Sequence, residues 1–317
     1  MTGKGLLLLM IHAQDCQRLV LVCVWHYAAA KRRQMEDLLH AKHAVDNGNS
    51  TIIIASEDTD VCVLCVAFCT RLGNGTLFLL KNTQKCRVNY YDINSVHRHM
   101  GAGICDALPA LHAFTGCDTV SAFAGRGKIS ALKHVISSDR FQEVFAKVGS
   151  EWVVTAEVMN ELERFSCLLY GCKDLDDIDE CRYRIFCTRK GDIEPQHVAP
   201  CRDALSKHIL RANYQAALWK RCLVAKPDVP SPTDIGWLRN ESGLTIDWMD
   251  NPPAPAAVLE LLSCTCTRTC QPDKCSCIAN RLVCTDMCKL INCTNRCDDN
   301  DTVTCSADDD SESDSDD

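Results

Sequence analysis

Short apolar runs separated by polar stretches dominate the first third of the chain. Residues 6–11, 19–25, 51–55, 76–80 and 86–90 predict strands, and residues 31–46, 92–100 and 104–114 predict helices. The run 51–55 is β-branched and leads into a longer apolar stretch without Gly or Pro, which predicts a buried parallel strand followed by a helix from about Thr59. This alternation predicts an α/β fold with a parallel sheet.

The pattern changes to purely helical spacing after residue 128. Val158, Leu162, Phe165 and Leu169 recur at helical intervals and end at Gly171, and a second helix is predicted from Leu205 to Trp219. Prolines then indicate extended connections. The predicted organisation is an α/β domain over 1–128, a helical extension over 129–225, a Pro-rich connection over 226–262, a Cys-rich module over 263–298 and a disordered acidic tail over 299–317.

Two acids follow the predicted strand 51–55. Asp58 and Asp60 lie just past its carboxyl end, and ligands of open α/β sheets bind in the crevice at that edge. Two carboxylates in one turn can converge on a hard divalent cation such as Mg²⁺. The alternative is that Ser56 or Asp58 only caps the following helix.

The turn Ser56-Glu57-Asp58-Thr59-Asp60, together with the downstream Gly116-Cys117-Asp118, resembles the flap-endonuclease/XPG branch of the PIN-like nucleases. The resemblance implies a PIN-like fold in which Asp58, Asp60 and Asp118 hold Mg²⁺ or Mn²⁺. It also implies help from an acid on the preceding helix. Glu36 and Asp37 are adjacent there and diverge by about 100°, so at most one can point into the site.

A Gly-rich turn follows at residues 123–128. In the family that this chain resembles, the corresponding turn holds the DNA backbone, which makes Arg126 and Lys128 candidate nucleic-acid-binding residues. A plain connection between helices is the alternative.

Cysteine is the residue type that departs most from an ordinary soluble protein. The chain has 24 cysteines, and ten of them lie between Cys264 and Cys305. No convincing export signal and no membrane-spanning apolar run is found, so a reducing compartment, no membrane partner and metal-bound thiolates are expected. The segment is too poor in apolar residues to bury a core, and about three structural Zn²⁺ ions with shared thiolates would need about nine sulfurs. The candidate ligands are Cys264, Cys266, Cys270, Cys275, Cys277, Cys284, Cys288, Cys293 and Cys297.

This spacing resembles the CXC domain of tesmin/TSO1-like proteins, which implies a three-zinc cluster that binds DNA. Leu290 stands where that family has its eighth cysteine, with Cys297 as a substitute, and Lys274 stands where a DNA-contacting aromatic residue usually precedes a cysteine. The combination of this cysteine-rich module with a PIN-like domain resembles the mobile-element-derived CXC proteins of animals. A nuclear DNA-binding zinc protein is therefore expected, or alternatively a cytoplasmic one; a non-enzymatic protein-interaction module is the competing interpretation.

Charge and aromatic residues refine this picture. The net charge of −8 comes mostly from the acidic segment 306–317, whereas bases outnumber acids around the cysteines, which suits phosphate contacts. Trp237, Trp248 and Met249 are expected to cover an edge of the main core, with nucleobase stacking as the alternative for the tryptophans.

Overall fold

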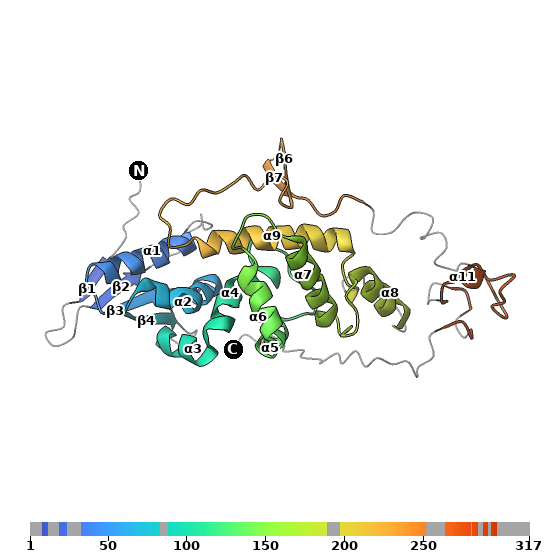
Figure 1. Cartoon of the computed structure of the whole chain (residues 1–317), viewed down its shortest axis with the longest axis horizontal. Helices are drawn as coiled ribbons and strands as arrows, with labels where there is room; N and C mark the ends of the chain where they lie inside the picture. The colour runs from blue at the N-terminus through green and yellow to red at the C-terminus, as the bar shows by residue number, and fades with distance from the viewer. Residues whose placement is uncertain are drawn as a thin grey trace.

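The computed structural model describes residues 8–11, 19–23, 33–82, 88–188, 197–241, 243–251, 264–279, 281–284, 288–290 and 293–296. Over these residues the chain is mixed α/β, with two small sheets and a large helical part (Figure 1). Its elements are β1 Leu8–Ile11, β2 Leu19–Cys23, α1 Arg33–Asp46, β3 Thr51–Ala55, α2 Thr59–Leu72, β4 Thr76–Asn82, β5 Val88–Asp92, α3 Ile93–Met100, α4 Ala102–Phe114, α5 Lys128–Ile136, α6 Asp139–Lys147, α7 Ala156–Leu169, α8 Ile178–Thr188, α9 Arg202–Lys220, β6 Trp237–Asn240, β7 Gly243–Ile246 and α11 Ser276–Ala279.

The larger sheet has five strands in the order β1-β2-β3-β4-β5. The three central strands are parallel, and both edge strands run antiparallel to their neighbours. The prediction of a central parallel strand at 51–55 is confirmed. Its burial alternates, because Ile52 and Ile54 are buried while the residues between them are half-buried, so this strand covers the core with one face.

Helix α2 carries the acidic turn at its start. Asp58 is its N-cap, and the side chain accepts a hydrogen bond from the backbone N–H of Asp60 at 2.8 Å. Val61, Leu64 and Phe68 bury the inner face of the helix, which packs between α1 and α4. The capping alternative considered for Asp58 is therefore confirmed as a local contact, and this cap sets where the two carboxylates lie.

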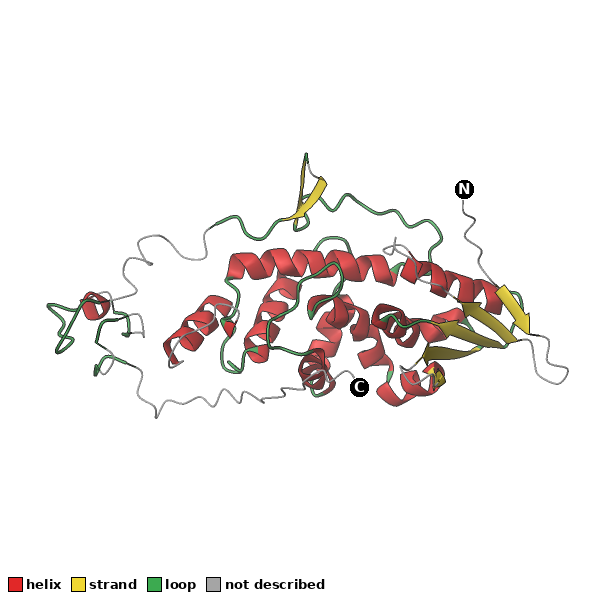
Figure 2. Cartoon of the chain, turned by 180° about the vertical axis from the view of Figure 1, so that it is seen from behind, coloured by secondary structure: helices red, strands yellow, loops and turns green. Residues whose placement is uncertain are grey.

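A single hydrophobic core runs from Leu38 to Cys222 and crosses residue 128 without a break. The sheet lies at one end of this body, and α9 runs along it and packs against α4 and α7 (Figures 1 and 2). Phe114, at the end of α4, contacts the rings of Phe123, Phe145, Phe165 and His208 with centroid distances from 5.1 to 6.0 Å. The predicted helical extension thus shares its core with the α/β part.

Strands β6 and β7 form a hairpin that the sequence did not predict. Trp237 is buried against Tyr214, with ring centroids 5.4 Å apart, as expected for an aromatic residue covering the core. Trp248 differs because 55% of its surface is exposed. None of the helices in the described residues is long and apolar enough to cross a membrane. The predicted acidic tail lies outside the described residues.

Candidate metal centre

The cysteine-rich segment gathers its thiols into one cluster. The sulfurs form two sets of four, and within each set all four sulfurs lie within 4.8 Å of one another. The sets share Cys264 and Cys284; one is completed by Cys277 and Cys288, and the other by Cys270 and Cys275. Two four-ligand sets that share two sulfurs are the arrangement expected of a thiolate cluster with bridging ligands.

The sulfur separations allow a direct test of whether zinc fits. A tetrahedral site with Zn–S bonds of about 2.3 Å has sulfurs about 3.8 Å apart, whereas a disulfide bond is about 2.05 Å. Neighbouring sulfurs of the cluster are 3.7 to 4.0 Å apart, and none of these cysteines is in a disulfide bond. The cluster therefore could hold metal ions, and its donor set and spacing are compatible with zinc.

Short backbone segments set this geometry. The one-turn helix α11 begins directly after Cys275 and contains Cys277, and the N–H of Cys275 donates to the carbonyl of Gln271 at 2.8 Å. Two N–H donors also reach sulfur: the backbone N–H of Cys264 to Cys288 Sγ, and Nδ2 of Asn295 to Cys284 Sγ, both at 3.4 Å. Such donors stabilise the negative charge of a metal-bound thiolate.

Burial makes the thiol of Cys277 resist ionisation when no metal is present. Desolvation and the neighbouring thiol of Cys288 together raise the pKa of Cys277 to about 12. Cys275 differs, because hydrogen bonds from the backbone of Ile278 and from neighbouring thiols outweigh its desolvation and lower its pKa to about 7. Because a thiol must lose its proton to bind zinc, metal binding at such a site releases protons and weakens in acid.

The remaining predicted ligands lie around these two sets. Cys266 is half-buried next to the thiols of Cys264, Cys270 and Cys275, and Cys293 is half-buried next to Cys270 and Cys284. Cys297 lies outside the described residues, so the ninth ligand stays a prediction. Leu290, which occupies an expected cysteine position, is half-buried.

Exposed cations surround the cluster. The side chains of Arg268, Lys274, Arg281 and Lys289 are exposed, whereas Arg296 is half-buried. Asp273 is the exposed acid among the described residues of this segment. The surface of the module is therefore basic, as predicted from its composition.

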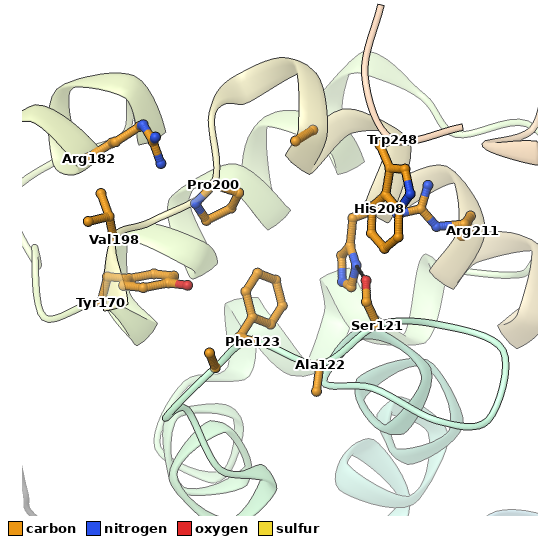
Figure 3. Close-up of a pocket in the computed structure, with 12 residues that line it drawn as sticks. Ser121, Ala122, Phe123, Tyr170, Arg182, Val198, Pro200, His208, Arg211 and Trp248 are labelled. Carbon is orange, nitrogen blue, oxygen red and sulfur yellow. Dashed lines mark hydrogen bonds between the residues drawn. The ribbon is translucent and has the colours of Figure 1, made fainter. Parts of the chain in front are cut away.

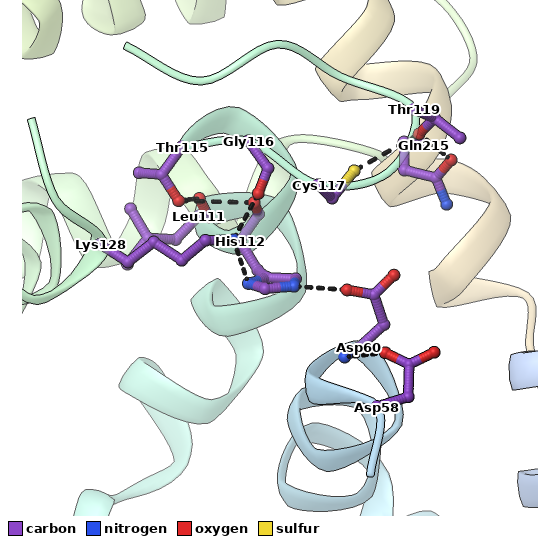
Figure 4. Close-up of polar contacts among 10 residues, drawn as sticks. All are labelled: Asp58, Asp60, Leu111, His112, Thr115, Gly116, Cys117, Thr119, Lys128 and Gln215. Atoms are coloured by element: carbon purple, nitrogen blue, oxygen red, sulfur yellow. Dashed lines mark hydrogen bonds and ion pairs between the residues drawn. The ribbon is translucent and has the colours of Figure 1, made fainter. Parts of the chain in front are cut away.

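The acidic turn forms a second polar site, at the start of α2. Asp60 is buried, and its Oδ1 accepts a hydrogen bond from Nε2 of His112 on α4 at 2.6 Å (Figure 4). Nδ1 of the same imidazole accepts from the Nζ ammonium of Lys128 at 2.9 Å. An ammonium only donates, so Nε2 carries the proton given to Asp60. The ring of His112 also stacks on Trp219, with centroids 5.6 Å apart.

Lys128 is an exposed residue, but its ammonium reaches inward to these contacts. Besides His112, its ammonium donates to the carbonyl oxygen of Gly116. Burial lowers the pKa of Lys128, while the charges of Cys117, Asp60 and Asp118 oppose that shift. Arg126, from the same Gly-rich turn, lies over the ring of Tyr170 at 5.0 Å.

The two acids of α1 separate as the sequence predicted. Glu36 is exposed, whereas Asp37 is buried, with 2% of its surface exposed. Desolvation raises the pKa of Asp37 to about 7, and the charges of Glu36 and Asp58 add to the shift. Its Oδ2 has no hydrogen-bond partner among the described residues.

The three aspartates of the predicted triad do not form a compact group in the structure. Asp58 is half-buried, Asp60 is buried and Asp118 is exposed. Among the described residues, their carboxylate oxygens do not form a group lying within 4.8 Å of one another. The triad stays a prediction, with Asp37 as the buried acid of α1 whose pKa the charge of Asp58 raises.

Sequence reasoning missed His112. A signal was present, because His112 stands in an otherwise apolar helix, where a buried polar side chain needs a partner.

No protein-family model, curated protein or solved structure matches this chain. Its function must therefore be inferred from its own residues.

Proposed function

We propose that this chain is a nuclear zinc-thiolate protein that binds DNA through its cysteine-rich module. The observation that carries the proposal is the pair of four-sulfur sets sharing Cys264 and Cys284, with separations that match tetrahedral zinc. The metal supplies the folding energy that so small a module cannot obtain from apolar burial.

The DNA-binding part of the proposal is supported by the exposed cations. Four basic side chains stand around the cluster and would neutralise phosphates, releasing counterions as DNA binds. Lys274 directly precedes Cys275, so metal binding would fix its backbone and aim its ammonium from a rigid support.

Substituting Arg268→Gln and Lys274→Gln together should weaken DNA binding and flatten its dependence on salt. Each lost phosphate contact should reduce the slope of log affinity against log salt by about one. Fluorescence anisotropy of a labelled DNA duplex at several salt concentrations measures both quantities. The matched control is Lys226→Gln with Arg239→Gln, which removes the same charge from exposed positions elsewhere.

Two outcomes would contradict this proposal in different ways. Zinc-loaded protein that binds no DNA would favour the competing interpretation, a protein-interaction module. Equal losses in the test and control variants would mean that total charge, rather than this module, determines binding.

A second candidate function, a divalent-metal nuclease of the PIN-like class, is favoured by one observation. The buried Oδ2 of Asp37 has no partner among the described residues, and Asp37 lies close enough to Asp58 for their charges to repel. A cation such as Mg²⁺ would relieve both costs; Asp37 and Asp58 would hold it, with Asp60 and Asp118 nearby. Bound there, it would polarise a phosphodiester and activate water.

Mn²⁺ or Mg²⁺ should raise the melting temperature of the wild-type chain at pH 8, where Asp37 is mostly ionised. Asp37→Asn should lose this metal-dependent shift and any cleavage of flapped or single-stranded DNA. The exposed Asp46→Asn on the same helix is the control and should behave as wild type. A wild-type chain with neither the shift nor cleavage would exclude this candidate and leave the zinc proposal untouched.

A further inference from the structure

A pocket of about 280 Å³ opens in the helical body, and its lining includes no residue of the cysteine cluster or of the acidic turn. It is enclosed by the loop after α4, the end of α7, α8, the start of α9 and the segment after β7 (Figure 3). The side chains that carry the argument are Ser121, Phe123, Tyr170, Arg182, Arg211 and Trp248. The volume is near the lower end of the range for small-ligand sites, about 300–1,000 Å³, so it fits one small molecule.

Three aromatic rings from separate parts of the chain line this pocket. Phe123 and Tyr170 meet edge to face, with ring centroids 6.3 Å apart. The guanidinium of Arg126 lies over the Tyr170 ring, with Cζ 5.0 Å from the ring centroid. Trp248 stands on the other side, next to His208 and Arg211 (Figure 3). It is 55% exposed although Arg211 Cζ lies 5.4 Å from its ring centroid. A fixed but exposed indole offers a flat face on which a planar ring can stack.

The charge of the pocket is positive. Arg182 and Arg211 line it, and its lining contains no Asp or Glu. His208 adds no charge at neutral pH, because burial, with a smaller effect from the nearby Arg211, lowers its pKa to about 4 even though Nε2 donates to the Phe114 carbonyl. Its Nδ1 is therefore free to accept from the hydroxyl of Ser121, at 3.3 Å.

Arg211 is an unusual buried cation. Only 1% of its surface is exposed, and Nη1 donates to the backbone carbonyls of Gly236 and Asp247 rather than to a carboxylate. Its Nε has no hydrogen-bond partner among the described residues. The carboxylate of Asp247 is instead paired with Lys207, Nζ to Oδ2, at 2.6 Å. The buried guanidinium thus has the charge of Asp247 nearby but makes no direct ion pair with a carboxylate, which favours binding of a further anion in the pocket.

We propose that this pocket binds one nucleotide, with its base against the aromatic rings and its phosphate near the two arginines. An aromatic wall and a positive charge without an opposing acid complement the two halves of that ligand. The nucleotide can come from a free nucleoside 5′-monophosphate or from the phosphorylated end of a single strand. The proposal needs neither DNA binding by the zinc module nor cleavage at the acidic turn.

Isothermal titration calorimetry of the full-length zinc-loaded chain with 5′-dAMP tests the inference. Saturable binding is expected, and it should be weaker with deoxyadenosine, which lacks the phosphate, and with deoxyribose 5-phosphate, which lacks the base. Trp248→Ala should weaken binding of 5′-dAMP about tenfold or more, since stacking is lost. Arg182→Gln should weaken 5′-dAMP binding but leave that of deoxyadenosine unchanged.

Two variants serve as matched controls. Met249→Ala alters an exposed apolar neighbour of Trp248, and Arg239→Gln removes an exposed arginine outside the pocket; both should bind as wild type. Competition by a 5′-phosphorylated single strand, but not by its unphosphorylated form, would support the inference and identify a strand end as the source. Binding of 5′-dAMP alone would support it with the free nucleotide as the source. Absence of saturable binding, or binding unchanged in Trp248→Ala, would overturn the inference.

Discussion

Cys264→Ser is expected to strip metal from both four-thiolate sets, whereas Cys288→Ser is expected to strip it from one. Cys264 belongs to both sets and Cys288 to only one. A serine hydroxyl does not replace a thiolate as a zinc ligand, so the number of ions lost should follow the number of sets that share the residue. Since structural zinc contributes about 10–16 kcal/mol to small zinc modules, losing both sets should unfold the segment.

Metal content per chain, measured by inductively coupled plasma mass spectrometry, distinguishes these variants. Cys284→Ser should match Cys264→Ser, and Cys275→Ser should match Cys288→Ser. Cys187→Ser is the control, because Cys187 is a half-buried cysteine that lies outside the cluster and is in no disulfide bond. Equal zinc loss from Cys264→Ser and Cys288→Ser would contradict shared ligands, and no zinc in the wild-type chain would contradict the metal centre itself.

Phe114→Ala should cause the largest loss of stability in the helical body. The ring is fully buried and touches four other rings from the loop before α5, α6, α7 and α9. Phe-to-Ala substitutions in cores cost about 3–5 kcal/mol, a large part of a typical total of about 5–15 kcal/mol. The expected fall in melting temperature is on the order of 10 °C.

Thermal unfolding followed by circular dichroism at two concentrations of the chain measures this effect. Phe114→Leu keeps most of the volume and should lose much less, and the exposed Ile129→Ala should change stability by less than about 0.5 kcal/mol. The core is continuous across residue 128, so the Phe114→Ala variant should still unfold in one transition. Two separate transitions would mean that the α/β and helical parts are independent.

Local sequence patterns predicted most of the secondary structure. The β-branched run at 51–55, the cap at Asp58 and the helical spacing from Val158 to Leu169 each depend on neighbours in the chain, and each forms the expected element. The hairpin of β6 and β7 was missed, because the prolines on either side of it suggested an extended connection, while Trp237 packs against Tyr214 from a distant helix.

The two candidate sites differ in the same way, because one is built within a short segment and the other from distant parts of the chain. Cysteine spacing alone predicted the metal cluster, because its ligands lie within one short segment and few chain paths can bring them together. The acidic site depends on contacts between residues far apart in the chain, such as Asp60 with His112 and His112 with Lys128. No local sequence pattern predicted these contacts.

The sequence by itself determined the strand and helix pattern, the acidic turn and the thiol-rich module, since hydrophobic periodicity, capping and ligand spacing act over a few residues. Only the tertiary structure decided that Asp37 rather than Glu36 is buried, that the ammonium of Lys128 donates to His112, and that Trp248 borders a cationic pocket. Those outcomes depend on which helices pack together, and packing is set by the shape and burial of the whole core rather than by any short segment.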